Sequence, residues 1–195
     1  VLTELGIHFT EEIGEAAFYG PKLDVNVKPA VGNEYTLSTC QLDFCLPERF
    51  HLKYADKNGE EQTPVVLHRA ILGSLDRFMA YLIEETMGAF PAWLAPVQVK
   101  VLPVTDRAAE YANEISAALD AKGFRMEVDE RNEKIGKKIR EATLEKVPYM
   151  LVVGDRDMEN KTVSVRTRSG EDLGAMSLEA FAAKLGEDVA TKAIH

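Results

Sequence analysis

Hydrophobic and polar residues alternate along two segments near the start of the chain. Residues 22–28 carry Leu23, Val25 and Val27 on one face. Residues 34–44 carry Tyr35, Leu37, Thr39, Gln41 and Asp43 on one face and Cys40, Leu42 and Phe44 on the other. A period of two is typical of strands, and the turn-forming residues 29–33 lie between the segments. The pattern predicts an antiparallel hairpin.

The period then changes from two to that of a helix. Segments 50–54 and 63–68 flank Asn58-Gly59, a strong turn signal, and predict a second hairpin. Apolar residues then recur at helical spacing between residues 75 and 87, with Ser74 as a candidate N-cap and Gly88 as a stop. An antiparallel sheet followed by a packed helix predicts an α+β first half.

The second half has a different pattern. Pro91 and Pro96 disfavour a helix and indicate a linker. Predicted strands and helices then follow in the order βαβαββα, which is typical of an α/β domain with a mainly parallel sheet. The strands are expected at 97–104, 124–128, 149–153 and 162–167, and the helices at 108–119, 135–144 and 178–185. We therefore expect two domains, residues 1–95 and 96–195.

Composition narrows the class of protein. Of 195 residues, 46% are hydrophobic and 28% charged, which excludes a disordered chain. No apolar run is long enough to cross a membrane, so a cytoplasmic location is expected. Cys40 and Cys45 match no common zinc motif and are expected to be reduced. The net charge is −9, yet residues 131–168 hold ten basic and six acidic residues, which is a weak indication of a polyanionic partner.

Three short stretches could carry chemistry. Arg77 lies in the first turn of the helix after Gly73-Ser74, where a guanidinium could bind a phosphate; a plain strand–helix junction is the structural alternative. Asn132 could cap the following helix or contact a nucleobase edge. Arg166 and Arg168 project from one face of a strand, which could equally be an ordinary exposed edge.

Several runs, in register and in order, are similar to the C-terminal part of bacterial threonyl-tRNA synthetases. The runs are GEAAFYGPKLD (14–24), QLDF (41–44), PERF (47–50), HRAILGSLDRF (68–78), FPAWLAPVQ (90–98), RNEKIG (131–136), VPYM (147–150) and VRTR (165–168). The resemblance implies that residues 1–95 are the end of a class II catalytic domain built on an antiparallel sheet. Residues 96–195 would be a mixed-sheet α/β anticodon-binding domain.

The resemblance also implies an activity. Family members use ATP with Mg²⁺ to activate threonine as an adenylate and then transfer it to threonine tRNA. The whole enzyme is a homodimer. A Zn²⁺ ion binds the amine and hydroxyl of threonine, which excludes valine because valine lacks the hydroxyl.

The family's functional residues match positions in this chain. Arg77 resembles the arginine that holds the ATP phosphates, and Lys22 a second catalytic residue near the transferred group. His68 resembles one of three zinc ligands. Tyr19, Thr39, Gln41 and Ser74 resemble the lining of the threonine and adenylate pocket. In the second domain Asn132 and Arg166 match residues that contact anticodon bases, with Glu133, Lys134 and Arg140 as weaker candidates.

Other family features are expected outside this chain. They are the second and third zinc ligands, the dimer-forming motif 1 and the phosphate-binding motif 2. We therefore expect a fragment that is inactive alone, holds no stable zinc and exposes an apolar sheet face. Thr36 also departs from the glutamine usual in the adenylate pocket. One alternative function is a tRNA-binding or regulatory module without catalysis. Another is a small adenylate-forming ligase, which would have no use for Asn132 and Arg166.

Overall fold

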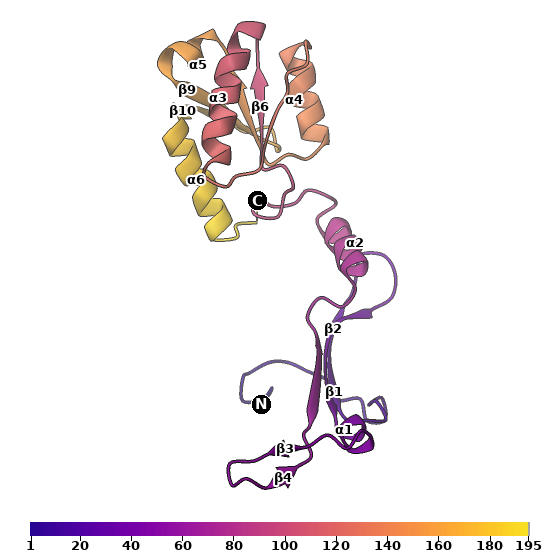
Figure 1. Ribbon diagram of the computed structural model, residues 1–195. Coiled ribbons are helices and arrows are strands. Elements are labelled where there is room, and N and C mark those ends of the chain that lie inside the picture. Colours follow the sequence, from indigo (N-terminus) through magenta and orange to yellow (C-terminus); the bar gives the residue numbers. More distant parts are fainter. Residues whose placement is uncertain (195) are drawn as a thin grey trace. The chain divides into compact units, whose positions relative to one another are not determined.

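The computed structural model describes residues 1–194. The chain divides into two compact units, Val1–Glu85 and Thr86–His195 (Figure 1). No helix within the described residues has the length and apolar character that a membrane-spanning helix needs.

The first unit is built on an antiparallel sheet in the order β1-β2-β5. Its strands are β1 (Lys22–Val27), β2 (Tyr35–Asp43) and β5 (Val66–Ala70). The β1–β2 hairpin is as predicted. The other elements of this unit are α1 (Cys45–Arg49), β3 (Tyr54–Ala55), β4 (Glu61–Gln62) and α2 (Leu75–Glu85).

The second hairpin forms at its predicted turn, but its strands are shorter than predicted. β3 and β4 pair over two residues each, and Val66–Ala70 pairs with β2 instead. Residues 45–49 form α1 instead of extending a strand, and Asp43, which precedes the N-cap Phe44, accepts hydrogen bonds from the backbone N–H groups of Cys45 and Leu46, both at 2.9 Å. Cys45 therefore lies on a helix rather than on the strand of Cys40, and both thiols are free.

Two glycines let the chain approach β2 closely. A Cβ at Gly20 would lie 2.2 Å from the carbonyl oxygen of Leu42, and one at Gly73 would lie 2.4 Å from that of Leu37. Gly73 also has φ +62, which disfavours any other residue there. These glycines bring the segments of Tyr19 and Ser74 against the central strand.

The second unit is a mixed sheet with helices on both faces. Its strands are β6 (Val99–Pro103), β7 (Met126–Val128), β8 (Tyr149–Val153), β9 (Thr162–Thr167) and β10 (Asp172–Ser177), in the order β10-β9-β8-β6-β7. The helices are η1 (Asp106–Ala108), α3 (Ala109–Asp120), α4 (Ile135–Leu144), α5 (Asp155–Asn160) and α6 (Leu178–Ala190). β6 runs parallel to β7 and β8, whereas β9 is antiparallel to β8 and β10. The sheet is thus less parallel than its apolar strands indicated, and α5 and β10 are additions to the predicted order.

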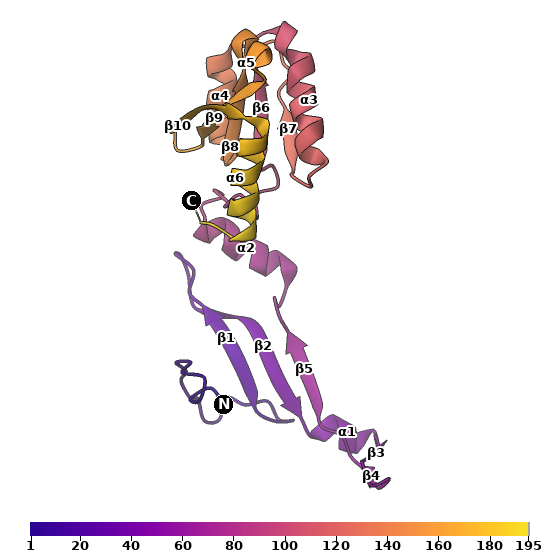
Figure 2. The ribbon, with the colours of Figure 1, turned by 90° about the vertical axis from the view of Figure 1, so that its left-hand side faces the viewer.

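The main hydrophobic core lies in the second unit. One sheet face packs against α3 and α6 through fully buried residues such as Val99, Leu151, Val165 and Phe181. The other face packs against α4 through Leu102, Ala142 and Met150. Figure 2 shows α3 and α4 on either side of β6.

The first unit leaves much of its apolar surface exposed. Leu23, Val25 and Leu67, which lie on the same sheet face, are exposed, and so are Leu75, Met79 and Ile83 on α2. The expected exposed apolar face is therefore present in this unit. Its polar face carries the candidate site.

The proline-rich segment between the predicted domains is packed rather than free. Ala92 and Ala95 are buried. The Gln98 side chain donates to the Ala92 carbonyl at 2.8 Å, and Arg125 donates to the carbonyls of Ala95 and Trp93 at 2.9 and 3.1 Å. This segment belongs to the second unit because these bonds satisfy its backbone.

Candidate functional sites

A row of polar residues crosses the sheet of the first unit. Lys22 on β1 is the cross-strand partner of Gln41 on β2, which is in turn the partner of His68 on β5. Directly paired residues share a face of a sheet. The Tyr19 hydroxyl donates to Gln41 Oε1 at 2.5 Å, and its ring meets the His68 ring edge-on at 6.0 Å between centroids. Four sequence-predicted residues are therefore brought together.

The neighbouring row carries an ion pair and a short hydrogen bond. Thr39 donates to Asp24 Oδ1 at 2.6 Å, and the Lys22 ammonium lies 2.9 Å from Asp24 Oδ2. The hydrogen bond from Thr39, with help from Lys22, lowers the pKa of Asp24 despite burial. The contact between Lys22 and Asp24 also raises the pKa of Lys22. Lys22 is thus held cationic and close to Gln41.

His68 contacts a buried carboxylate. Its Nε2 lies 2.9 Å from Oδ2 of Asp43, whose side chain is fully buried while that of His68 is 45% exposed. Burial raises the pKa of Asp43, but the hydrogen bonds from His68, Leu46 and Cys45 outweigh it and lower the pKa. Asp43 is thus a fixed acceptor that orients the imidazole.

The described residues around His68 do not supply enough metal ligands for a zinc site. Within residues 1–194, no three His, Cys, Asp or Glu side chains gather as metal ligands. Structural and catalytic zinc sites need three or four protein ligands. The sequence-based expectation of no stable zinc in this chain stays a prediction.

Ser74 and Arg77 lie at the start of α2. The Phe78 N–H donates to the Ser74 carbonyl at 2.9 Å, so Ser74 precedes the first helical turn as predicted. The exposed Arg77 guanidinium lies 5.9 Å from the centre of the Tyr35 ring. In the described chain no hydrogen bond or ion pair joins Arg77 to the row of Lys22, Gln41 and His68.

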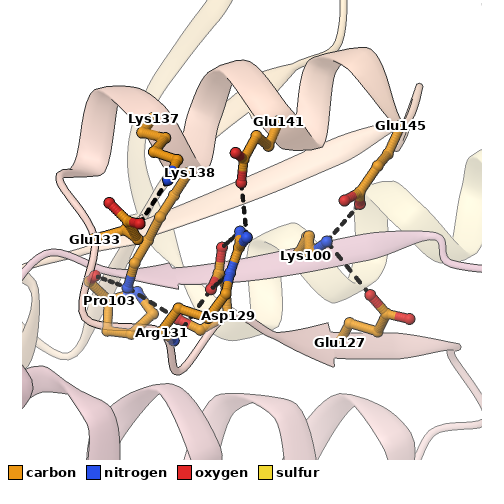
Figure 3. A network of polar contacts seen from close by, with 10 residues as sticks. All are labelled: Lys100, Pro103, Glu127, Asp129, Arg131, Glu133, Lys137, Lys138, Glu141 and Glu145. Carbon is orange, nitrogen blue, oxygen red and sulfur yellow. Dashed lines mark hydrogen bonds and ion pairs between the residues drawn. The ribbon is translucent and has the colours of Figure 1, made fainter.

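In the second unit the segment before α4 is held by a polar network (Figure 3). Arg131 binds the buried Asp129 through two hydrogen bonds, at 2.8 and 2.6 Å, and lies 2.8 Å from Glu141 of α4. The Lys138 ammonium donates to the carbonyls of Pro103 and Asp129 at 3.1 and 2.9 Å. Lys138 is therefore buried, whereas Lys137 and Arg140 of the same helix are exposed.

The network leaves the predicted RNA-contacting residues at the surface. Asn132, Glu133, Lys134 and Arg140 are all exposed. Glu133 pairs with Lys137 at 2.5 Å. The N-cap of α4 is Lys134, with extended backbone, so the prediction that Asn132 caps this helix is wrong. The Asn132 amide is therefore not used as a cap.

Arg166 lies on a different element from the Asn132 segment. It is the cross-strand partner of Met150 on β8 and of Asp172 on β10, and its Nη2 lies 3.1 Å from Asp172 Oδ2. The same row continues through Lys100 to Glu127. Among the described residues, no hydrogen bond or ion pair links Arg166 to Asn132, Glu133 or Lys134.

Comparison with known proteins identifies the family. Residues 1–86 match the tRNA synthetase class II core domain (G, H, P, S and T), and residues 98–188 match the anticodon binding domain. The chain is 54% identical over 192 residues to a threonine–tRNA ligase from Geobacillus kaustophilus (strain HTA426). It is 53% identical over 184 residues to one from Stenotrophomonas maltophilia (strain R551-3). The chain belongs to the threonyl-tRNA synthetase family.

A solved structure agrees with this assignment. The RNA binding domain of threonyl-tRNA synthetase from Cryptosporidium parvum Iowa II matches with a TM-score of 0.85 and 37% identity, over 95% of this chain and 47% of that chain. The two bacterial threonine–tRNA ligases match 98% and 94% of this chain, which spans 29% of the length of each. The predicted resemblance and fold class are confirmed.

Sequence reasoning missed several carboxylates in this chain. Asp24 and Asp43 hold Lys22 and His68, and Asp172 holds Arg166. The strand period contained a signal for two of them, since Asp24 lies two residues from Lys22 and Asp43 two residues from Gln41. Asp172 had none, because β10 was not predicted as a strand.

Proposed function

We propose that this chain is part of a threonine–tRNA ligase. The proposal rests on the row of Lys22, Gln41 and His68, which Tyr19 contacts through Gln41. This row lies in a unit that matches the class II core. A cation, an amide and an imidazole on one sheet face suit a small zwitterion bearing a hydroxyl. Threonine is such a substrate.

Each residue of the first unit has a proposed role. Tyr19, Thr39, Gln41 and Ser74 line the threonine and adenylate pocket. Arg77 binds the ATP phosphates, and its exposed guanidinium leaves its donors accessible to them. Lys22, held cationic by Asp24, stabilises negative charge near the transferred group.

The second unit is proposed to bind the anticodon of threonine tRNA. Asn132 and Arg166 contact bases, since an exposed amide and a guanidinium suit base edges. Glu133, Lys134 and Arg140 belong to the same surface. The basic stretch 131–168 supplies charge that attracts a polyanion.

Further partners and location follow from the family. We infer ATP with Mg²⁺ as cofactor and homodimerisation of the whole enzyme, in the cytoplasm. Zn²⁺ would be bound in the whole enzyme with His68 as one ligand. The metal would bind the threonine hydroxyl and amine. Within this chain Asp43 orients the imidazole of that ligand.

The difference in burial between the two units favours a second function, tRNA binding without catalysis. The fully buried apolar residues lie in the second unit, whereas the first unit exposes its apolar sheet face. A chain of this kind could bind tRNA through the second unit without catalysing activation. In this proposal the tRNA-binding domain comprises residues 96–195, and the preceding segment 86–95 packs with it as part of the same unit.

One experiment separates the two functions. Threonine-dependent ATP–pyrophosphate exchange is measured with this chain and zinc, beside its affinity for threonine tRNA. Retained tRNA binding without exchange supports the binding module, and clear exchange supports the ligase. Asn132→Ala and Arg166→Ala should each weaken tRNA binding by about 1–3 kcal/mol. Lys122→Ala, exposed just after α3, is the control and should have little effect. Unchanged binding in both test variants would overturn the anticodon assignment.

A further inference from the structure

The β9–β10 hairpin contains a carboxylate that is itself fixed in place. Oδ1 of Asp172 accepts the N–H of Gly174 at 2.9 Å, and Oδ2 lies 3.1 Å from Nη2 of Arg166. The register shifts between Asp172 and Gly174, which marks a β-bulge, and Gly174 has φ +79. A bulge of this kind re-aims a side chain. Here it directs the carboxylate toward Arg166.

The strand that carries Arg166 is firmly anchored. Val163 and Val165, on the opposite face of β9, are fully buried in the main core. Arg166 is flanked by the buried Met150 on one side and by Asp172 on the other. Its side chain is 38% exposed. Arg166 thus starts from an anchored strand, and its guanidinium pairs with one carboxylate among the described residues. Part of the side chain stays open to solvent.

We propose that Asp172 is a positioning residue for RNA recognition, which holds the Arg166 guanidinium across the hairpin so that its remaining donors face the anticodon. The inference rests on the proposed role of Arg166. A flexible arginine must lose rotamer freedom when it binds, and an arginine that is already held loses less. Removing Asp172 should therefore weaken RNA binding although Asp172 carries the same sign of charge as RNA.

That sign distinguishes positioning from simple electrostatics. A carboxylate near a phosphate backbone repels it, so charge alone predicts that Asp172→Asn tightens binding. Positioning predicts the opposite. Glu114→Gln supplies the control, because Glu114 is also exposed, in the same unit, and paired with a cation, Lys161, at 3.9 Å.

The test measures the affinity of the full chain for a threonine tRNA transcript, and for the same transcript with altered anticodon bases, at fixed salt. Asp172→Asn should weaken binding to the first by about 3- to 10-fold and reduce discrimination between the two. Glu114→Gln should leave affinity within about twofold, because a distant exposed charge contributes little. Asp172→Glu, which keeps the charge, should restore part of the loss. Circular dichroism checks that each variant is folded.

A double-mutant cycle completes the test. In an Arg166→Ala background, Asp172→Asn should have no further effect, because Asp172 acts through Arg166. Tighter binding by Asp172→Asn, or an equal loss in both backgrounds, would overturn the inference. If Arg166→Ala itself leaves binding unchanged, the proposed anticodon role of Arg166 fails. If Arg166→Ala weakens binding while Asp172→Asn does not, the anticodon role stands and only the positioning role fails.

Discussion

The imidazole Nε2 of His68 lies 2.9 Å from Oδ2 of Asp43, and Oδ1 of the same carboxylate accepts the first two backbone N–H groups of α1. One buried side chain thus links the start of a helix to the orientation of a candidate ligand residue. An ionised carboxylate only accepts hydrogen bonds, so Nε2 of His68 must carry the proton. In a neutral imidazole Nδ1 is then the ring nitrogen that carries the lone pair.

Asp43→Asn should reverse this tautomer. The asparagine Oδ1 must still accept the two backbone N–H groups of α1, which leaves its amide nitrogen facing His68 as a donor. Nε2 then becomes the acceptor and Nδ1 carries the proton. Long-range ¹H–¹⁵N correlation of neutral His68 measures the change, with the exposed His51 as an internal reference. An unchanged tautomer would contradict the geometry of the pair.

Lys138→Met should destabilise the second unit strongly. The Lys138 side chain is 4% exposed and donates to two carbonyls at the ends of β6 and β7, which the substitution leaves unsatisfied. Such a loss costs about 2–4 kcal/mol. The measurement is urea unfolding followed by fluorescence of Trp93, the single tryptophan.

Lys137→Met provides the matched control. Lys137 is adjacent, exposed and paired with Glu133 four residues earlier. Loss of such a surface pair costs about 0.3–0.5 kcal/mol. Equal destabilisation by the two variants would show that the buried ammonium has no special role.

Asp129 should make the stability of the second unit pH-dependent. The hydrogen bonds from Arg131, which outweigh burial, hold the pKa of Asp129 below its ordinary value of 3.8. A carboxyl group whose pKa is lower in the folded state than in the unfolded state stabilises the fold. This stabilisation is complete above the unfolded-state pKa and is lost as the pH falls through the folded-state pKa. Asp129→Asn should therefore lose less stability than the parent between pH 6 and pH 3 in urea unfolding. Asp120→Asn, which changes an exposed carboxylate of α3, should keep the parent's dependence.

A fragment comprising residues 86–195 should be more stable than one comprising 96–195. Residues 87–95 carry backbone carbonyls bound by Gln98, Arg125, Lys146 and Arg168, and the shorter fragment removes these acceptors. The shorter fragment also lacks Ala92, so the core residues that pack against Ala92 become exposed. Urea unfolding followed by circular dichroism compares the two. A shorter fragment of equal stability would show that the segment is only a linker.

The strand pairings of the first sheet differ in how far the sequence pattern predicted them. The β1–β2 hairpin was predictable because its alternation and its turn are local. The partner of β5 was not, because Asn58-Gly59 favours a local hairpin while the free edge of β2 lies far away in sequence. α1 was missed because Asp43, which binds its first backbone N–H groups, also continues the alternating pattern of the preceding strand.

The sequence by itself determined the family, the order of most elements and the face shared by Thr39, Gln41 and Asp43, because these depend on residue identity and on a period of two. The tertiary structure alone decided the pairs Asp43–His68, Asp24–Lys22 and Asp172–Arg166. It also decided that Lys138 is buried and that residues 87–95 are packed. These features depend on which strands become neighbours, and a strand's register against a distant partner is set by the hydrogen bonds and packing of the whole sheet.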